Sequence, residues 1–141
     1  MNDYELIRLE KHVDERGELY VAEPFKNIPF DIRRVFWVMN APDGTRRAGH
    51  AHKECRQVLV GLQGDIDIHL TFQDRKVMDI SMSGNSGIGL LVEPGVRIDY
   101  MLSGDAIMLV LASKPYDVGD YFSFMEEEYV VTSLVSDTVN P

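Results

Sequence analysis

The residues in this sequence best suited to acid–base chemistry are two histidines, His50 and His52, separated by one residue. In an extended segment, side chains two positions apart leave the same face of the strand, so both imidazoles would point the same way. Four basic residues crowd the same stretch of an otherwise acidic chain: Arg46, Arg47, Lys53 and Arg56. Positive charges beside a histidine lower its pKa below the usual value of about 6.5. We therefore expect neutral imidazoles near pH 7, which can accept a proton from a substrate.

Spaced glycines bracket this histidine pair. Five residues separate Gly44 from His50, four separate His52 from Gln57, and six separate Gln57 from Gly64. This spacing resembles the first sequence motif of the cupin superfamily, whose members are small barrels with a pair of histidines pointing into the mouth. The usual motif ends in Glu, whereas this chain has Gln57. The resemblance implies a cupin-type double-stranded β-helix, also called a jelly roll.

Metal binding is the alternative chemistry for a cupin-like histidine pair. Metal-binding cupins add a carboxylate after the two histidines and a third histidine from a second motif. Here the carboxylate position is Gln57, a neutral and poorer ligand, and the second-motif region, Glu93 to Arg97, has no histidine. His12 precedes an N-terminal turn, and His69 lies on the polar side of its predicted strand. Two imidazoles without a carboxylate do not make a convincing site, so we expect no metal and no cofactor.

The elements that must position the histidines are short strands. In the segment Asp65–Phe72, the apolar side chains Ile66, Ile68, Leu70 and Phe72 alternate with polar ones, which is typical of a half-buried antiparallel strand. Besides this segment and the histidine strand, we predict strands at Tyr4–Leu9, Leu19–Ala22, Ile32–Met39, Val58–Leu62, Val77–Met82, Ile88–Val92, Arg97–Leu102 and Ala106–Ala112. Gly, Pro and Asp turns separate them, as in an all-β sandwich or barrel of jelly-roll type.

The chain of 141 residues predicts one jelly-roll domain over residues 1–135 and a polar tail over 136–141. Near the end, Tyr116 to Tyr129 predicts either a small C-terminal helix or an irregular strap. The formal net charge of −9 disfavours nucleic acid and anionic membranes as partners. The single cysteine, Cys55, cannot form an internal disulfide, and no apolar run is long enough for a signal core or a membrane span. We therefore expect a cytoplasmic protein.

Several segments, taken together, identify a closer relationship within the cupins. They are Arg33–Val38, Arg47–Lys53, Gln57–Val60 and Leu109–Ser113, followed by Tyr116-Asp117 and Asp120-Tyr121. In this order they resemble the metal-independent sugar 3,4-ketoisomerases that act on dTDP-4-keto-6-deoxyglucose. The match runs over most of residues 4 to 125. The resemblance implies a role in 3-amino-3,6-dideoxysugar synthesis, for O-antigen and other glycans or for antibiotics.

The resemblance also implies a reaction and the residues that carry it. The keto group moves from C4 to C3 of the sugar: a base removes the C3 proton, an enediolate forms, and a proton returns to C4. By the family pattern, His50 and His52 are the acid–base residues. Arg47, three residues before His50, would face the sugar or its oxyanion.

Binding a nucleotide diphosphate to an acidic protein requires locally placed cations. The candidates are Arg33, Arg34, Arg46 and Arg97, and further substrate-binding candidates in the matched segments are Lys53, Gln57 and Tyr100. Arg16 matches a position that, in some family members, reaches the active site of the neighbouring subunit. Together with the many apolar strands, this favours a homodimer, for which crossed N-terminal strands are one arrangement.

The sequence also departs from the family pattern. Phe36-Trp37 stands where the family often has paired tyrosines, and Arg97-Ile98 follows Pro94 where the family has Trp and a polar residue. Because two registers are possible at Arg97, the product configuration at C4, gluco or galacto, stays open, as do the nucleotide base and the downstream pathway. Two other functions also stay open. One is an epimerase of nucleotide-linked keto sugars, with Tyr100 or Tyr121 as its acid, and the other is a non-catalytic sugar-binding cupin.

Overall fold

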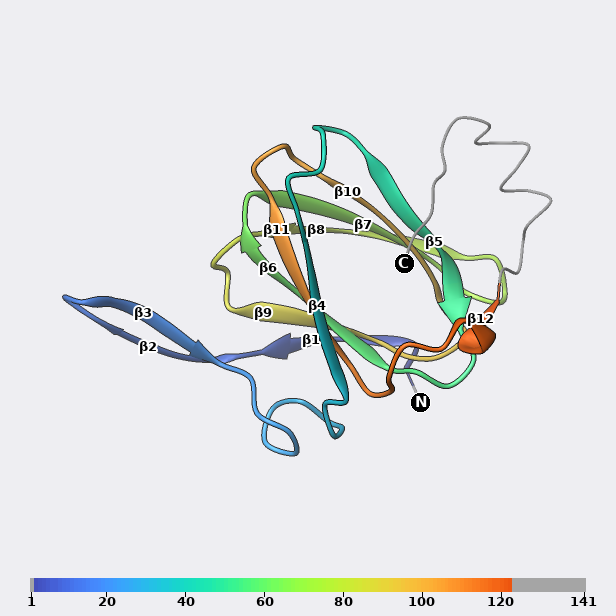
Figure 1. Ribbon diagram of the computed structural model, residues 1–141, viewed down its shortest axis with the longest axis horizontal. Helices are drawn as coiled ribbons and strands as arrows, with labels where there is room; N and C mark the ends of the chain where they lie inside the picture. Colours follow the sequence, from blue (N-terminus) through green and yellow to red (C-terminus); the bar gives the residue numbers. More distant parts are fainter. Residues whose placement is uncertain (1, 123–141) are drawn as a thin grey trace.

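The computed structural model describes residues 2–122, and these form two five-stranded antiparallel sheets packed face to face (Figure 1). The first sheet has the order β1 (Tyr4–Arg8), β9 (Ile88–Val92), β6 (Gln57–Gln63), β11 (Ile107–Ala112) and β4 (Arg34–Met39). The second has the order β12 (Tyr121–Phe122), β5 (Arg46–His52), β10 (Arg97–Leu102), β7 (Asp65–Thr71) and β8 (Val77–Ser83). The predicted all-β jelly roll is confirmed.

The main core lies between the sheets. On β7 the predicted alternation holds, since Ile66, Ile68 and Leu70 are all essentially inaccessible to solvent. They pack with Leu59 of β6 and Leu90 of β9 in the facing sheet. Burying each such side chain contributes about 1.5–3 kcal/mol, so this core fixes the spacing between the sheets and the position of β5 relative to β6.

A second apolar cluster covers the outer face of the first sheet. Val58 and Val60 of β6 point outward into it, where Ile28 and Phe30 from the loop before β4 cover them. Consequently β6 is buried on both faces for most of its length. This explains why Val58–Leu62 reads as an unbroken apolar run rather than as an alternating strand.

A two-stranded hairpin extends away from the sheets at the left of Figure 1. It consists of β2 (Glu10–Asp14) and β3 (Gly17–Val21). The sequence predicted the turn and the second strand, but it gave no signal for β2. The reason is that β2 is solvent-exposed over nearly its whole length and therefore carries no apolar face.

The segment after β11 forms a strap rather than an α-helix over the described part of the chain. It contains the 3₁₀ turn η1 (Val118–Asp120), capped by Asp117, and then β12, which pairs with the end of β5. The remainder of the predicted helix or strap, the domain boundary at residue 135 and the polar tail lie outside the described residues. Within residues 2–122, no helix has the length and apolar character needed to cross a membrane.

Candidate active site

A small cavity of about 30 Å³ lies between the two sheets beside the histidine strand. Residues from both sheets line it, among them Phe36, His50, His52, Gln57, Tyr100 and Tyr121. Its position follows from strand order, because β5 and β12 form the edge of one sheet and β4, β11 and β6 face them from the other. The two predicted imidazoles therefore share one partly enclosed space.

A β-bulge controls the direction of the side chains on β5. Opposite β10, Ile98 pairs with His50 and Asp99 pairs with Ala48, so Gly49 is the extra residue. Ala48 and Gly49 both have left-handed backbones, with φ of 75° and 96°. In a regular strand, residues three apart point to opposite faces. The bulge restores one face for Arg47 and His50, and the pairing of Arg47 with the cavity-lining Tyr100 agrees with this.

The two imidazoles lie close to each other and to a tyrosine. The ring centroids of His50 and His52 are 5.4 Å apart with an interplanar angle of 72°. Tyr121 stacks on His50 at 4.1 Å with nearly parallel rings, and its edge meets His52 at 4.8 Å. This packing restricts the rotation of both imidazoles. It also leaves little room for water around His50.

Asp120 orients His52. The two side chains form a buried hydrogen bond of 3.0 Å between Nδ1 of His52 and a carboxylate oxygen of Asp120. The same carboxylate accepts the backbone N–H groups of Glu54, at 2.8 Å, and Cys55, at 3.1 Å. Because an ionised carboxylate can only accept, the hydrogen bond assigns the proton of His52 to Nδ1. Its Nε2 is then left with a lone pair that can take up a proton.

Burial controls the protonation of both histidines. Desolvation, followed by the charges of His52 and Arg97, lowers the pKa of His50 to about 4. Burial also lowers the pKa of His52 from its ordinary value, although the hydrogen bond to Asp120 opposes the shift. Asp120 itself has a lowered pKa: burial would raise it, but the hydrogen bonds from His52, Cys55 and Glu54 outweigh burial. Both imidazoles are therefore neutral at pH 7.

Two phenols complete the cavity. Burial raises the pKa of Tyr100, although the neighbouring Arg47 guanidinium opposes the shift. Burial likewise raises the pKa of Tyr121, here against Arg34. Both hydroxyl groups thus stay protonated and can donate a hydrogen bond. Among residues 2–122, the buried Nε of Arg47 has no hydrogen-bond partner, so this donor can serve a ligand.

The side chains present do not fit the usual cupin metal site. Gln57 replaces the carboxylate beside the histidines, and no histidine comes from the β9–β10 connection. A different group of possible ligand atoms, on His52, Cys55 and Asp120, lies within 4.8 Å of one another. In that group the imidazole and the carboxylate already hydrogen-bond to each other. We therefore derive no catalytic step through a metal.

Comparison with known proteins agrees with this geometry. The sequence matches the family described as FdtA: WxcM-like, C-terminal, over residues 2–131. It is 38% identical over 117 residues to TDP-4-oxo-6-deoxy-alpha-D-glucose-3,4-oxoisomerase of Aneurinibacillus thermoaerophilus, which covers 82% of this chain and 83% of that enzyme. The chain belongs to the FdtA family.

Solved structures of sugar 3,4-ketoisomerases resemble this FdtA-family chain over nearly its whole length. QdtA from Thermoanaerobacterium thermosaccharolyticum, in complex with TDP, is 31% identical with a TM-score of 0.82, over 92% of this chain and 93% of QdtA. A His-to-Asn mutant of QdtA in complex with TDP-4-keto-6-deoxyglucose is 30% identical with a TM-score of 0.82, over 95% and 99% of the two chains. The sugar epimerase NovW of Streptomyces spheroides, at 14% identity and a TM-score of 0.74 over 86% and 68%, shares the fold alone.

The predicted substrate-binding residues of this FdtA-family chain fall into two groups. Gln57 and Tyr100 line the histidine cavity. Arg34 lies beside it, since its guanidinium is 4.5 Å from the ring centroid of Phe36 and its charge lowers the pKa of His52. Together with Arg47, these residues are the part of the predicted set that the fold gathers around the imidazoles.

The other predicted residues lie elsewhere. Arg33 is exposed beside Asp31, Lys53 is exposed after β5, and Arg16 is at the tip of the hairpin, paired with Asp14. Arg46 and Arg97 occupy strand positions on the outer face of the second sheet, where both guanidinium groups approach Asp99. Arg97 nevertheless acts on the cavity through its charge on His50. None of these five contributes a side chain to the lining of the histidine cavity.

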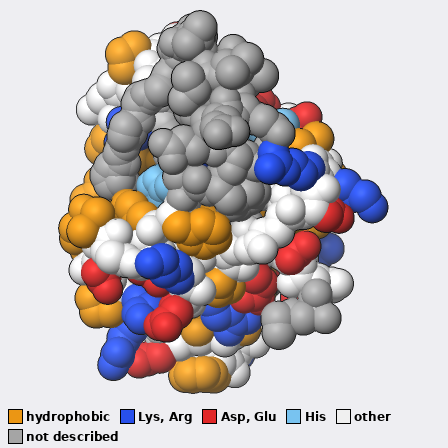
Figure 2. Space-filling model, turned by 90° about the vertical axis from the view of Figure 1, so that its right-hand side faces the viewer, with side chains coloured by type: hydrophobic (Ala, Val, Ile, Leu, Met, Phe, Trp, Pro, Cys, Tyr) orange, Lys and Arg blue, Asp and Glu red, His pale blue; other side chains and the backbone are white. Residues whose placement is uncertain are grey.

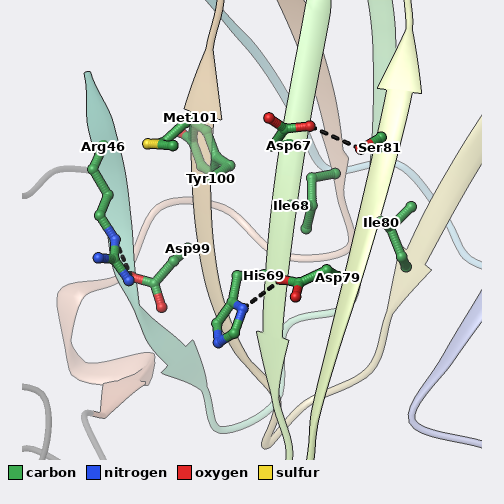
Figure 3. A pocket seen from close by; sticks show the side chains of 10 residues that line it. All are labelled: Arg46, Asp67, Ile68, His69, Asp79, Ile80, Ser81, Asp99, Tyr100 and Met101. Atoms are coloured by element: carbon green, nitrogen blue, oxygen red, sulfur yellow. Dashed lines mark hydrogen bonds and ion pairs between the residues drawn. The ribbon is translucent and has the colours of Figure 1, made fainter. Parts of the chain in front are cut away.

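A larger cavity of about 450 Å³ lies on that outer face (Figure 3). Its polar groups are already paired, His69 with Asp79 at 2.6 Å and Asp67 with Ser81 at 2.8 Å. Its single imidazole is held by an exposed carboxylate, and among the described residues no second imidazole lines it. Chemistry rather than size therefore identifies the histidine cavity as the candidate active site.

The sequence reasoning missed the role of Asp120. This residue was noted only as part of the matched Asp120-Tyr121 segment, whereas in the fold it orients His52 across 68 positions of sequence. Tyr121 belonged to the same matched segment and was a candidate epimerase acid, but its stacking on His50 was not foreseen. The available signal was the placement of an acid and an aromatic residue at the end of the strap, where β12 returns to β5.

Proposed function

We propose that this protein is a sugar 3,4-ketoisomerase that moves the keto group of dTDP-4-keto-6-deoxyglucose from C4 to C3 without a metal. The observation that carries the proposal is a pair of neutral imidazoles with centroids 5.4 Å apart, one of them anchored by a buried carboxylate. Two adjacent imidazoles can carry the two proton transfers that moving a keto group between neighbouring carbons involves. The kinship with curated and solved 3,4-ketoisomerases supports the same reaction.

In this proposal His52 removes the proton from C3 with Nε2, and the C4 carbonyl becomes an enediolate oxygen. Asp120 favours this step because it stabilises the imidazolium that forms. Arg47 and Tyr100 stand on the cavity side of the sheet and can donate to the enediolate oxygens. The C3 hydroxyl then gives its proton to the neutral imidazole of His50, which passes it to C4, and His52 returns the proton that it took from C3 to the C4 oxygen. Both imidazoles end neutral, and the product is the 3-keto sugar with a C4 hydroxyl group.

The experiment that tests the proposal is incubation with dTDP-4-keto-6-deoxyglucose in deuterated water, with and without a chelator, followed by NMR. We expect the carbonyl to move to C3 in both samples. Asn replacement of each histidine then separates their roles. His52→Asn should abolish exchange at C3, whereas His50→Asn should retain exchange at C3 and lose migration. Each should lower turnover by about 10²- to 10⁴-fold.

An epimerase is the second candidate, because Tyr121 stacks on His50 and presents a protonated phenol in the cavity. Exchange at C3 and C5 with the ketone still at C4 would favour it. A sugar-binding protein without activity would show no exchange and would keep its ligand when either histidine is replaced. The deuterium experiment thus distinguishes all three functions in one measurement.

We further infer a homodimer. Val35, Trp37 and Met39 project from one face of β4, the edge strand of the first sheet, and each is at least 45% exposed; we call these three residues the β4 face. Exposed apolar side chains on a sheet edge favour pairing with another chain. In such a dimer Arg16, at the tip of the projecting hairpin, would serve the partner's site rather than its own. We also propose that the protein acts in the cytoplasm, in the synthesis of dideoxy-aminosugars for glycans.

A further inference from the structure

Arg47 and His50 share the cavity only because β5 contains the bulge at Ala48 and Gly49. Glycine tolerates a left-handed backbone, but an L-alanine at φ 75° is strained by its Cβ atom. A strained residue persists when the surrounding structure holds it in place. On the inner face, Ala48 lines the histidine cavity and packs against the main core. The question is therefore what holds the bulge from the outer face.

The residue directly opposite Ala48 is Asp99 of β10, on the outer face of the second sheet. It is only 3% exposed. Its Oδ2 accepts a hydrogen bond of 3.1 Å from Nε of Arg97. Its Oδ1 faces Nε of Arg46 at 3.9 Å (Figure 3). Arg46 is the first residue of β5, so this carboxylate links the strand just before the bulge to the strand beside it.

The connection from Asp99 to the cavity is short. Its neighbours Ile98 and Tyr100 point through the sheet into the histidine cavity, and Ile98 pairs with His50 across the register shift. Likewise Arg46 points outward while the next residue, Arg47, points inward. A shift of Asp99 would therefore move cavity residues on both strands at once.

A buried carboxylate is costly, and the Oδ1 atom of Asp99 accepts no hydrogen bond from the described part of the chain. The carboxylate pairs with the buried guanidinium of Arg97, and the same charge attracts Arg46, so the two arginines together offset the cost of burying it. The side chain of Arg46 is 35% exposed and borders the outer cavity, and its contact with Asp99 ties the first residue of β5 to β10.

We propose that Asp99 is a positioning residue for the proposed isomerase: with Arg46 it holds the Ala48–Gly49 bulge from the outer face and so aims Arg47 and His50 into the cavity. It touches no substrate. The proposal rests on the proposed function, and it assigns to Arg46 a role different from binding the diphosphate.

The first test compares Asp99→Asn with Asp79→Asn, which removes an exposed carboxylate that lines the same outer cavity but lies away from the bulge. We expect Asp99→Asn to lower kcat about tenfold or more while KM stays within about twofold, and Asp79→Asn to behave as the wild type. A drop in melting temperature with unchanged kcat would overturn the proposal, because it would show a merely structural role.

We call the pair of Asp99 and Arg46 the clamp. The second test uses Ala48→Gly, which removes the backbone strain at the bulge that the clamp is proposed to hold in place. Asp99→Asn should cost at least about threefold less in kcat when combined with Ala48→Gly than when made alone. Equal costs would overturn the proposal. If Asp99→Asn does not fold, Arg46→Met takes its place, and its cost in kcat is again compared with and without Ala48→Gly. A raised KM with unchanged kcat in Arg46→Met would then assign Arg46 to substrate binding and reject the clamp.

Failure of the proposed function is distinguishable from failure of the clamp. If the wild-type protein moves no carbonyl, the proposed function falls, and the clamp is then tested by a crystal structure of Asp99→Asn. The clamp predicts that Ala48 leaves the left-handed region in this variant and that Arg47 and His50 no longer share a face. An unchanged bulge in that crystal would overturn the clamp.

Discussion

His50 works in a desolvated setting, and this sets the pH range in which it can act. Burial, reinforced by His52 and Arg97, lowers its pKa to about 4. Because the neutral imidazole is the active form, activity should be retained as the pH falls through 6.5, where a solvated histidine would already be protonated. Because burial also lowers the pKa of His52, we expect the acid limb of kcat/KM to lie below pH 6.5. A limb centred at 6.5 would show that the active histidines are not desolvated.

Asp120 should matter through His52 rather than through substrate contact. In Asp120→Asn the amide cannot stabilise an imidazolium, and it can replace only part of the hydrogen bonds to Nδ1 and the two backbone N–H groups. We expect kcat to fall about 10²-fold or more, with a much smaller change in KM. Steady-state kinetics of this variant, with Asp74→Asn in a remote turn as the control, check the prediction. A change confined to KM would contradict it.

At the residue scale, the sequence revealed the histidine pair because strand periodicity alone places residues 50 and 52 on one face. It could not reveal why Arg47 joins them, since that depends on the bulge at Ala48 and Gly49. Nor could it connect His52 to Asp120, because a contact across 68 positions exists only once the strap has folded back. Short-range spacing was predictable, whereas tertiary contacts were not.

At the scale of elements, β12 acts as the cover of the histidine strand. It places Tyr121 flat against His50 at 4.1 Å, which contributes to the desolvation of that imidazole. Tyr121→Ala should admit water, so the pKa of His50 should rise toward 6.5 and the acid limb of kcat/KM should move to higher pH. Tyr121→Phe keeps the ring and should leave the limb in place.

Histidine NMR titrations of the two Tyr121 variants measure this shift directly. If both variants titrate like the wild type, the desolvation of His50 comes from the sheets and not from the strap. Loss of activity in Tyr121→Phe at an unchanged pKa would instead assign a chemical role to the hydroxyl group, as the epimerase hypothesis requires.

Strands were predictable where one or both faces are buried. Alternation identified β7, and an apolar run identified β6. The same reasoning failed at β2, whose side chains face solvent on both sides. A strand whose side chains are mostly exposed leaves no apolar pattern, and it is also the kind of element that gains most from a partner chain.

For the whole molecule, charge and apolar surface are distributed differently. On the coloured part of the face shown in Figure 2, acidic and basic side chains are interspersed, so these described residues offer no continuous basic field for a polyanion. The β4 face, in contrast, gathers three large apolar side chains on one edge strand. It continues the second apolar cluster, since Trp37 pairs with Leu109 and Val35 with Leu111. Apolar surface that continues a core beyond its own chain is typical of an oligomer interface.

The proposed dimer therefore predicts that Trp37→Glu, at the centre of the β4 face, yields a monomer in sedimentation velocity, because dimerisation would bury its charge without a partner. Met101→Glu, on the outer face of the other sheet, is the matched control and should stay dimeric.

If Arg16 serves the partner's site, monomeric Trp37→Glu should also lose affinity for the sugar nucleotide, which raises its KM. Arg16→Ala should show the same raised KM while remaining dimeric. A fully dimeric Trp37→Glu would place the interface elsewhere. A monomer with wild-type KM would confine each site to its own chain.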